Sequence, residues 1–394
     1  MIRKVWPLVA AAVSLGIDAY VLAGVLPQIA GSLSTTVGAI GLGVTAFTAA
    51  YAVAGTTLSR RATRGSTRRG LLLALGLFNA ANLITALAPD LPVFLGSRVL
   101  SGMGAGILTA VATAAAAGLA SEGQRGRAMS MVTFGLSAGT VAGVPVGMLV
   151  GEQLGWRWTM GLVVLVGVVS MAALAVRGGE IPPVPDEPGS GVSAVASWQV
   201  LSGIALAFLS GVTSLGLYTY LLPMAADSGL RAWGFALIWV WGIGGVAGSV
   251  LVGKRIDTIG AGRMLPALAT ALLASFAVVA FTPWPAAWLA ATLVWGAAGW
   301  AGVPALQDAL TRTRPEATTT IVAFQMAAMY LGSAAGSALG TALLGAETPA
   351  GELPIWAAAA QVGAVALAVA VGAAGRRAAT ARTARARSRR VRPC

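Results

Sequence analysis

Histidine is absent from the 394-residue chain, and cysteine occurs once, at the last position, Cys394. The chain therefore has no histidine proton relay and no histidine metal ligand, and it cannot form an intramolecular disulfide. Charged residues are also scarce: they make up 10% of the sequence, against about 25% in soluble proteins. Hydrophobic residues make up 57%. Together these values exclude an ordinary soluble protein and indicate an integral membrane protein.

Apolar runs separated by turn signals predict membrane helices, because a bilayer is crossed by about 20 consecutive apolar residues. The first run follows Arg3 and Lys4 as in a signal peptide, but it is too long and has no cleavage site before its end, so we expect it to be retained. We predict an all-α membrane protein with 12 transmembrane helices. The predicted spans are 5–29, 38–58, 71–88, 93–120, 128–151, 158–176, 199–223, 233–253, 264–282, 286–310, 320–344 and 355–375.

Basic residues lie on one side of this predicted topology. With the N-terminus in the cytoplasm, 23 of the 26 lysines and arginines fall in cytoplasmic segments, and only Arg98, Arg157 and Arg231 lie elsewhere. The positive-inside rule therefore places both termini in the cytoplasm. It also explains the net charge of +13 without a nucleic-acid partner, since a basic tail beside anionic lipid is sufficient.

The longest connection, at 177–198, contains four prolines and three acidic residues and divides the predicted helices into six and six. Its composition is that of a flexible linker rather than of a folded domain. The predicted organisation is an N-terminal six-helix bundle at 1–176, a cytoplasmic linker at 177–198, a C-terminal six-helix bundle at 199–375 and a basic cytoplasmic tail at 376–394.

The two predicted bundles repeat each other. Pro27 and Pro223 end the first and seventh spans at an offset of 196 residues, and a stripe of glycines in span 5 returns in span 11 at an offset of 197. This pattern predicts two parallel repeats related by a pseudo-two-fold axis, an arrangement that places substrate between the halves. The glycines of span 5 are Gly135, Gly139, Gly143, Gly147 and Gly151, and those of span 11 are Gly332, Gly336 and Gly340.

The glycine stripe of span 5 has no side chains that would keep a neighbouring helix away, and close approach drives helix association in lipid. We expect a helix of the other half to cover the stripe and to slide along it as the halves rock. The alternative is static packing within the first six helices. Pro145 interrupts the stripe, removes one backbone donor and is expected to kink the helix.

Two charged residues lie inside predicted spans, Asp18 in span 1 and Arg98 in span 4. A charge at this depth costs about 2.5–3.5 kcal/mol, and desolvation favours the neutral form of a carboxyl. We interpret Asp18 as a proton-coupling residue with Arg98 as its partner; the alternatives are a static ion pair, an arginine that binds substrate, or one that snorkels to the interface. Polar and aromatic residues inside other spans are candidates for a substrate cavity, namely Tyr20, Tyr51, Tyr218, Tyr220, Gln325 and Tyr330.

Several segments resemble motifs of the major facilitator superfamily, and within it of the twelve-helix drug:proton antiporters. They are "LGIDAYVLAGVLPQIA" in span 1, "RVLSGMGAG" with Arg98 in the arginine position, and "GLSAGTVAGVPVG" in span 5, which is similar to the antiporter signature. The loop motif after span 2 is degraded, since Gly55 fits but Ser59 replaces the acid. The copy in the second half is better kept, at Gly253, Asp257, Gly260 and Arg263.

The resemblance implies efflux of a small lipophilic or amphiphilic molecule, such as a drug or antibiotic, by alternating access and driven by protons. A proton-coupled importer or a facilitator of a sugar, nucleoside or amino-acid derivative is the alternative on the same fold. The spans offer no acid pairs and the chain has no ATP-binding loop, so we expect neither an enzyme nor an ATP-driven pump. We expect no metal and no cofactor other than protons, and a monomer in a bacterial plasma membrane whose partners are its substrate and the bilayer.

Overall fold

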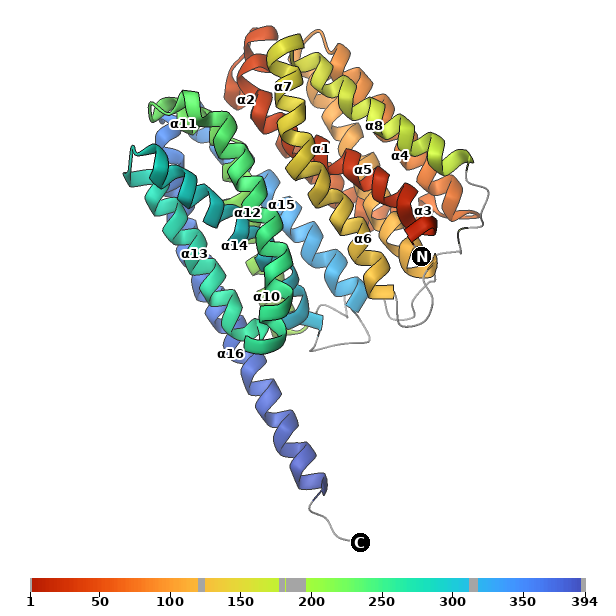
Figure 1. Cartoon of the computed structure of the whole chain (residues 1–394), viewed down its shortest axis with the longest axis vertical. Helices are drawn as coiled ribbons and strands as arrows, with labels where there is room; N and C mark the ends of the chain where they lie inside the picture. Colours follow the sequence, from red (N-terminus) through yellow and green to blue (C-terminus); the bar gives the residue numbers. More distant parts are fainter. Residues whose placement is uncertain (1, 120–124, 177–180, 182–195, 312–317, 391–394) are drawn as a thin grey trace.

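The computed structural model describes residues 2–119, 125–176, 181, 196–311 and 318–390. Every regular element in these ranges is helical, and twelve of the helices are long and apolar enough to cross a membrane (Figure 1). They coincide with the predicted spans to within a few residues at most of their ends. The prediction of an all-α membrane protein with twelve spans is confirmed.

Most spans are a single helix, but the fifth and the seventh each contain a π-helical segment. The helices of the first half are α1 (Ile2–Ser32), α2 (Val37–Thr57), α3 (Ser59–Ala62), α4 (Thr67–Leu87), α5 (Leu91–Leu119), α6 (Arg125–Ala138), the π-helix η1 (Gly139–Gly143), α7 (Val144–Leu154) and α8 (Trp156–Val176). Those of the second half are α10 (Trp198–Ser210), the π-helix η2 (Gly211–Gly216), α11 (Leu221–Asp227), η3 (Arg231–Trp233), α12 (Gly234–Ile259), α13 (Ala261–Phe281), α14 (Pro285–Thr311), α15 (Thr318–Gly345), η5 (Ala350–Glu352) and α16 (Leu353–Arg390).

Local sequence signals set where several of these helices begin and end. Thr36, Ser66 and Ser197 precede α2, α4 and α10, and each side-chain oxygen accepts a hydrogen bond from a backbone N–H of the first turn. Gly155 and Gly260 follow α7 and α12 with φ of +96° and +83°, values that L side chains adopt only with strain. Short turns therefore connect α7 to α8 and α12 to α13.

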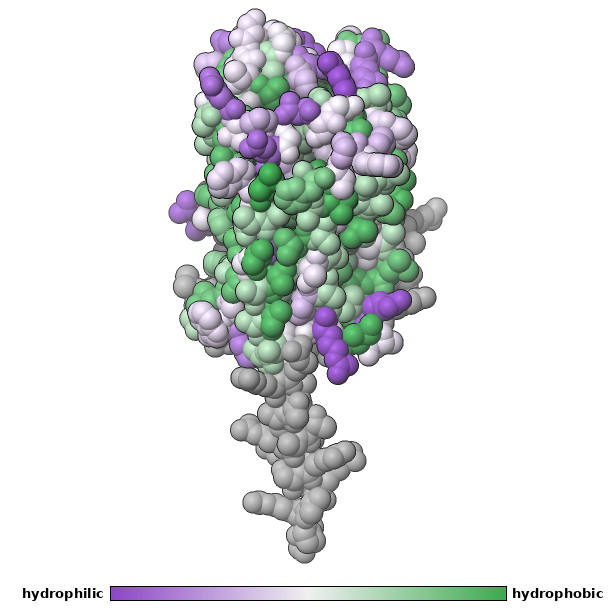
Figure 2. Space-filling model, turned by 90° about the vertical axis from the view of Figure 1, so that its left-hand side faces the viewer, coloured by the Kyte–Doolittle hydropathy of each residue, from purple (hydrophilic) through white to green (hydrophobic). Residues whose placement is uncertain are grey.

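Helix α1 begins and α16 leaves the bundle at the same end of the molecule, which we call the basic end (Figure 1). Arg61, Arg64, Arg255 and Arg263 are exposed there. Figure 2 shows a broad hydrophobic band around the middle of the visible face, with hydrophilic residues gathered toward its two ends. This distribution is the one that a membrane-spanning bundle requires.

Helix α16 continues past the bundle to Arg390, so the backbone of most of the predicted tail is a helical extension of the last span. Most of the predicted linker lies outside the described residues. On either side of it, α1–α8 and α10–α16 form two groups of helices, coloured red to yellow and green to blue in Figure 1.

The glycine stripe of span 5 packs on α1, a helix of its own half. A Cβ on Gly139 would overlap the backbone carbonyl of Val13, and one on Gly143 would overlap the side chain of Ile17. Gly135, Gly147 and Gly151 likewise face α1, at Val9, Val21 and Val25. The expectation that a helix of the other half covers the stripe is wrong, because the four-residue period specifies a smooth groove but not which helix fills it.

The second stripe repeats this packing in the second half. A Cβ on Gly332 would overlap the carbonyl of Phe208, and one on Gly336 would overlap that of Val212, so span 11 packs on span 7 as span 5 packs on span 1. The repeat seen in the sequence is therefore also present in the structure, because the closest backbone contacts are equivalent in the two halves.

Pro145 is the second residue of α7, which directly follows the π-helical segment η1. Proline lacks the N–H that would bond four residues back, and its ring would clash with that carbonyl, so a wider π turn accommodates it. The predicted irregularity at Pro145 thus takes the form of a π turn. Val141 of this turn faces Gly242 of α12, which is where span 5 reaches the other half.

Candidate functional site

Asp18 and Arg98 form a buried ion pair in the first half. Asp18 lies on α1 and Arg98 on α5, Nη1 of Arg98 is 2.8 Å from Oδ1 of Asp18, and the two side chains are 0% and 1% exposed. The pairing satisfies two charges that would be costly alone in a bilayer. The structure thus brings together the two charged residues that lie inside predicted spans.

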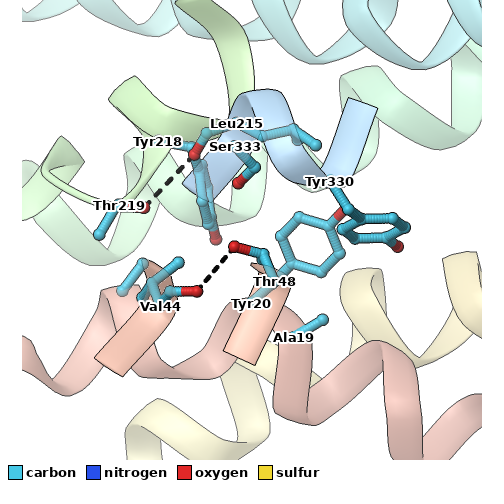
Figure 3. Close-up of a pocket in the computed structure, with 10 residues that line it drawn as sticks. Ala19, Tyr20, Val44, Thr48, Leu215, Tyr218, Thr219, Tyr330 and Ser333 are labelled. Atoms are coloured by element: carbon cyan, nitrogen blue, oxygen red, sulfur yellow. Dashed lines mark hydrogen bonds between the residues drawn. The ribbon is translucent and has the colours of Figure 1, made fainter. Parts of the chain in front are cut away.

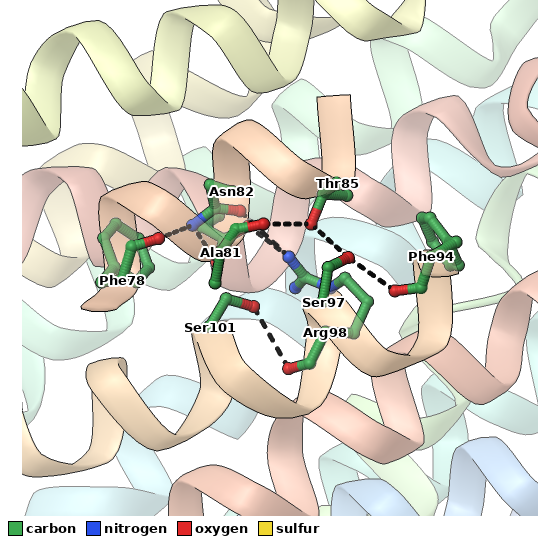
Figure 4. Close-up of polar contacts among 9 residues, drawn as sticks. Phe78, Ala81, Asn82, Thr85, Phe94, Ser97, Arg98 and Ser101 are labelled. Atoms are coloured by element: carbon green, nitrogen blue, oxygen red, sulfur yellow. Dashed lines mark hydrogen bonds and ion pairs between the residues drawn. The ribbon is translucent and has the colours of Figure 1, made fainter. Parts of the chain in front are cut away.

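Asn82 of α4 is the third member of this site, which we call the coupling triad (Asp18, Asn82 and Arg98). Its amide oxygen accepts a hydrogen bond from Nη1 of Arg98 at 3.2 Å, and its Nδ2 donates to Oδ2 of Asp18 at 3.3 Å. The same Nδ2 is 3.1 Å from the carbonyl oxygen of Phe78, one turn away on α4 (Figure 4). Asn82 therefore links both charged groups to α4.

Arg98 is further held by an aromatic ring. Its Cζ lies 4.5 Å from the ring centroid of Phe47 on α2, a cation–π distance, whereas its Nε has no partner among the described residues. Near it, the hydroxyls of Thr85 and Ser97 are 2.8 Å apart and join α4 to α5. Through Asp18, Asn82 and Arg98 this site therefore joins α1, α4 and α5 by one ion pair and the hydrogen bonds around it.

The second half has a corresponding site without charge. Nε1 of Trp295 on α14 donates to Oγ of Ser214 in η2 at 2.8 Å, and the ring of Phe276 on α13 meets that of Trp295 edge to face at 5.2 Å. These residues belong to spans 7, 9 and 10, the counterparts of spans 1, 3 and 4. We call Ser214, Phe276 and Trp295 the neutral triad.

A small cavity lies between the halves, with room for little more than a water molecule. Figure 3 shows the side chains around it converging from α1, α2, the end of span 7 and α15. Three of the predicted substrate residues, Tyr20, Tyr218 and Tyr330, line it. Its other lining residues are Ala19, Ala23, Val44, Thr48, Leu215, Thr219 and Ser333.

Around Tyr20 lies an aromatic cluster that joins the halves. The ring centroid of Tyr20 on α1 is 5.8 Å from that of Tyr218, 5.7 Å from that of Trp241 and 5.9 Å from that of Trp300. Tyr218 and Trp241 are stacked at 4.1 Å with an angle of 30° between their planes. We call these four residues the aromatic cluster. Trp241 and Trp300 were not predicted as cavity residues, because tryptophan in a membrane protein is typical of interface anchors.

Tyr20 and Asp18 lie two residues apart on α1, which is about 200° around a helix. Asp18 consequently faces α4 and α5, whereas Tyr20 faces the second half. Helix α1 thus separates the coupling triad from the aromatic cluster while it carries one residue of each.

The remaining predicted cavity residues lie elsewhere. Tyr51 of α2 packs on Tyr330 of α15 with ring centroids 4.2 Å apart, so it contacts the cavity lining from behind. The hydroxyl of Tyr220 donates to the carbonyl oxygen of Ser337 at 2.7 Å, nearer the end opposite the basic end. Gln325 is turned toward α14, where its Nε2 is 3.4 Å from the carbonyl oxygen of Val303.

Helices α2 and α15 are joined across the halves near the end opposite the basic end. The hydroxyls of three residues donate to backbone carbonyls of the other helix, two of them at glycines where no side chain intervenes. We call this set the hydroxyl seal: Ser337 to Gly41 at 2.9 Å, Thr341 to Gly38 at 2.9 Å and Thr45 to Ala334 at 3.2 Å.

The residues of the loop motifs lie toward the basic end. Gly55 of α2 lies close to the backbone of Gly106 on α5, where a Cβ would come within 3.1 Å of the carbonyl oxygen. Gly260 makes the turn after α12, and Arg263 is exposed in the first turn of α13. Gly253 and Asp257 lie on α12, but the surroundings of Asp257's side chain are outside what the structure describes.

The sequence profile of the Major Facilitator Superfamily matches residues 8–337. The chain belongs to this superfamily. It is a membrane transporter of the superfamily rather than a member of an enzyme family, and the match covers the coupling triad, the cavity and the first two residues of the second glycine stripe.

Relatives and solved structures agree with this assignment. The chain is 30% identical to a chloramphenicol resistance protein of Streptomyces lividans, over 89% of this chain and 91% of that protein. It is 27% identical to the uncharacterized MFS-type transporter YbcL of Bacillus subtilis, over 86% and 87% of the two chains. The crystal structure of a D-xylose–proton symporter has the same fold, with a TM-score of 0.75, 14% identity and coverage of 94% and 96%.

Proposed function

We propose that this transporter exports a small lipophilic or amphiphilic molecule, such as a drug or antibiotic, in exchange for protons. The observation that carries the proposal is the coupling triad: a buried carboxylate bonded to a guanidinium within the membrane, beside a cavity between two halves. Intramembrane acids of this kind are typical of proton relays. The chloramphenicol resistance protein among the relatives supports a drug-like substrate.

In the proposed cycle, Asp18 is ionised and bonded to Arg98 in one conformation and takes up a proton in another. Losing the ion pair frees α1 from α4 and α5, and α1 also carries Tyr20 at the aromatic cluster. Proton binding on one side of α1 would then alter substrate contacts on the other side. The driving force is sufficient, since one charge that crosses 100 mV supplies about 2.3 kcal/mol before any pH gradient is added.

We also propose that the basic end faces the cytoplasm of a bacterium and that the protein works as a monomer. The distribution of lysine and arginine supports this orientation. Topology reporters fused at residue 185 and at the C-terminus should both indicate a cytoplasmic location. A periplasmic location at either site would contradict the proposed orientation.

Transport of radiolabelled chloramphenicol into proteoliposomes, with a pH gradient imposed, tests the exchange. Accumulation on the side from which protons flow supports export coupled to protons. Accumulation on the side to which protons flow would instead establish proton-coupled import, and equilibration without accumulation would establish a facilitator.

Asp18→Asn should abolish accumulation while downhill movement of the substrate continues, because the amide keeps the shape of the carboxylate but cannot carry the proton. Glu152→Gln is the matched control, since Glu152 is an exposed carboxyl on α7 and should be dispensable. Accumulation by Asp18→Asn at the wild-type level would remove Asp18 from the mechanism.

A further inference from the structure

The central cavity is lined without formal charge. None of its ten lining residues is an acid or a base, and Asp18 and Arg98 are bonded to each other on the far side of α1. A charged ligand in this cavity would lose its water without gaining an ion pair, which is strongly unfavourable in a low-dielectric site. The lining therefore favours an uncharged ligand.

Two hydrogen-bond donors at the aromatic cluster have no partner among the described residues. They are the hydroxyl of Tyr218 and Nε1 of Trp241, whose side chains are 2% and 1% exposed. In Figure 3 the side chain of Tyr218 extends toward Tyr20 and Thr48, across the cavity. Buried polar groups are normally hydrogen-bonded, so this pair of donors in stacked rings is available to a partner that the protein itself does not supply, either a water molecule or a ligand.

Other buried aromatic donors of the second half are satisfied by the protein, whereas the hydroxyl of Thr292 on α14 is also without a partner among the described residues. Nε1 of Trp295 donates to Ser214 and Nε1 of Trp288 donates to the carbonyl oxygen of Thr282 at 2.7 Å. The hydroxyl of Tyr220 likewise has partners on α15. Among the buried aromatic donors described in this half, those of Tyr218 and Trp241 are thus unused, and they lie where the two halves meet.

We propose that the aromatic cluster binds an uncharged, flat aromatic molecule whose carbonyl or nitro oxygen accepts hydrogen bonds from Tyr218 and Trp241. The ligand ring would lie between Tyr20 of the first half and the stacked rings of the second half, in place of their present contacts at 5.7–5.8 Å. Such a ligand gains ring contacts from both halves at once. The proposal names the substrate class of the proposed exporter and rests on that function, but binding can be measured without transport.

The test is equilibrium binding to the purified, full-length protein in lipid nanodiscs. The probes are chloramphenicol, an uncharged nitrophenyl compound, ethidium as an aromatic cation, and D-xylose as an uncharged compound without an aromatic ring. We expect the protein to bind chloramphenicol, and to bind ethidium and xylose at least tenfold more weakly.

Tyr218→Phe and Trp241→Phe each remove one donor and keep an aromatic ring. Each should weaken chloramphenicol binding about 3- to 10-fold, the range expected for one neutral hydrogen bond. Trp158→Phe is the matched control, because Trp158 is 64% exposed and lies outside the cluster. The analogue of chloramphenicol that lacks the nitro group gives a second measurement on the unaltered protein, and it should bind the wild type about 3- to 10-fold more weakly.

Three results would each overturn the proposal. The first is tighter binding of ethidium than of chloramphenicol, and the second is no detectable binding of chloramphenicol. The third is an affinity that changes neither in the two Phe variants nor when the nitro group is missing from the ligand. These outcomes are separate from those of the exchange proposal. If chloramphenicol binds as expected but no pH gradient drives its accumulation, the ligand class stands and proton-coupled export fails. If accumulation depends on Asp18 but only cations bind, export stands and the ligand class fails.

Discussion

The helices that meet around the ion pair in the first half have counterparts in the second half that meet without any charge. The residues concerned are Asp18, Asn82 and Arg98 in the coupling triad, and Ser214, Phe276 and Trp295 in the neutral triad. The backbone packing of both halves is nevertheless alike, since each places a glycine stripe on the first helix of its own half. The fold therefore does not need a charge at this position.

The contrast also separates two energetic roles. A buried ion pair gains little stability over a neutral packed site, but it is costly to break because one charge remains unpaired. A site of this kind is a poor choice for stability alone and a suitable one for a group that changes its charge during function. Substitutions in the two triads should therefore have effects of different size and kind.

The largest effect is expected from Arg98→Ala. It leaves Asp18 buried without its guanidinium and should lower the free energy of unfolding by about 3–5 kcal/mol. Adding Asp18→Asn to the same chain should restore most of that loss, because no buried charge remains, but should not restore accumulation driven by a pH gradient. Thermal denaturation in detergent and proteoliposome transport measure the two outcomes.

Arg98→Lys serves as the control for this substitution, since it keeps the positive charge but loses the planar fork of the guanidinium. It should be intermediate in both assays. If Arg98→Ala is as stable as the wild type, the ion pair is not as strictly buried as the structure shows, and the contrast between the triads fails.

An intermediate effect, equal in both halves, is expected at the glycine stripes. Gly139→Ala and Gly336→Ala each place a methyl group against a backbone carbonyl of the helix beneath, which cannot move without shifting that helix. Each should lower the free energy of unfolding by about 1–3 kcal/mol. Gly302→Ala is the control, since nothing lies within 4 Å of its added carbon. A large effect in one half only would show that the two halves are packed less alike than their backbones indicate.

The smallest effect is expected in the neutral triad. Ser214→Ala removes the acceptor of Trp295, and Trp295→Phe removes the donor, so each should cost about 0.5–1.5 kcal/mol. Neither should change how transport depends on the pH gradient, which is the measurement that distinguishes this triad from the other. A loss of coupling in Ser214→Ala would mean that proton coupling is shared between the halves.

The features that the sequence predicted correctly are those that the membrane imposes strongly. A span must be apolar and of a fixed length, so twelve spans and two halves followed from the runs and their offsets. Two opposite charges at membrane depth must find partners, and Asp18 and Arg98 pair with each other. Asn82 was not predicted to belong to this site, because its position within a span does not show which residues it bonds.

Features that depend on which helices are neighbours were not predictable. The glycine period indicated a groove in span 5, but its partner is α1 rather than a helix of the other half. Tyr220 and Gln325 are polar residues of the kind that line cavities. The side chain of Tyr220 instead bonds Ser337 of α15, and that of Gln325 bonds Val303 of α14. Trp241 and Trp300 contact Tyr20 only because spans 1, 8 and 10 converge, which no local pattern encodes.

The hydroxyl seal has a consequence for which arrangement of the two halves is populated. Its three hydrogen bonds between α2 and α15 join neutral groups, so they contribute about 0.5–1.5 kcal/mol each and are insensitive to ionic strength. Together they correspond to a population ratio on the order of 10- to 1,000-fold between the joined and separated arrangements. A contact of this strength keeps one end of the molecule shut for most of the time, and it does so at any salt concentration.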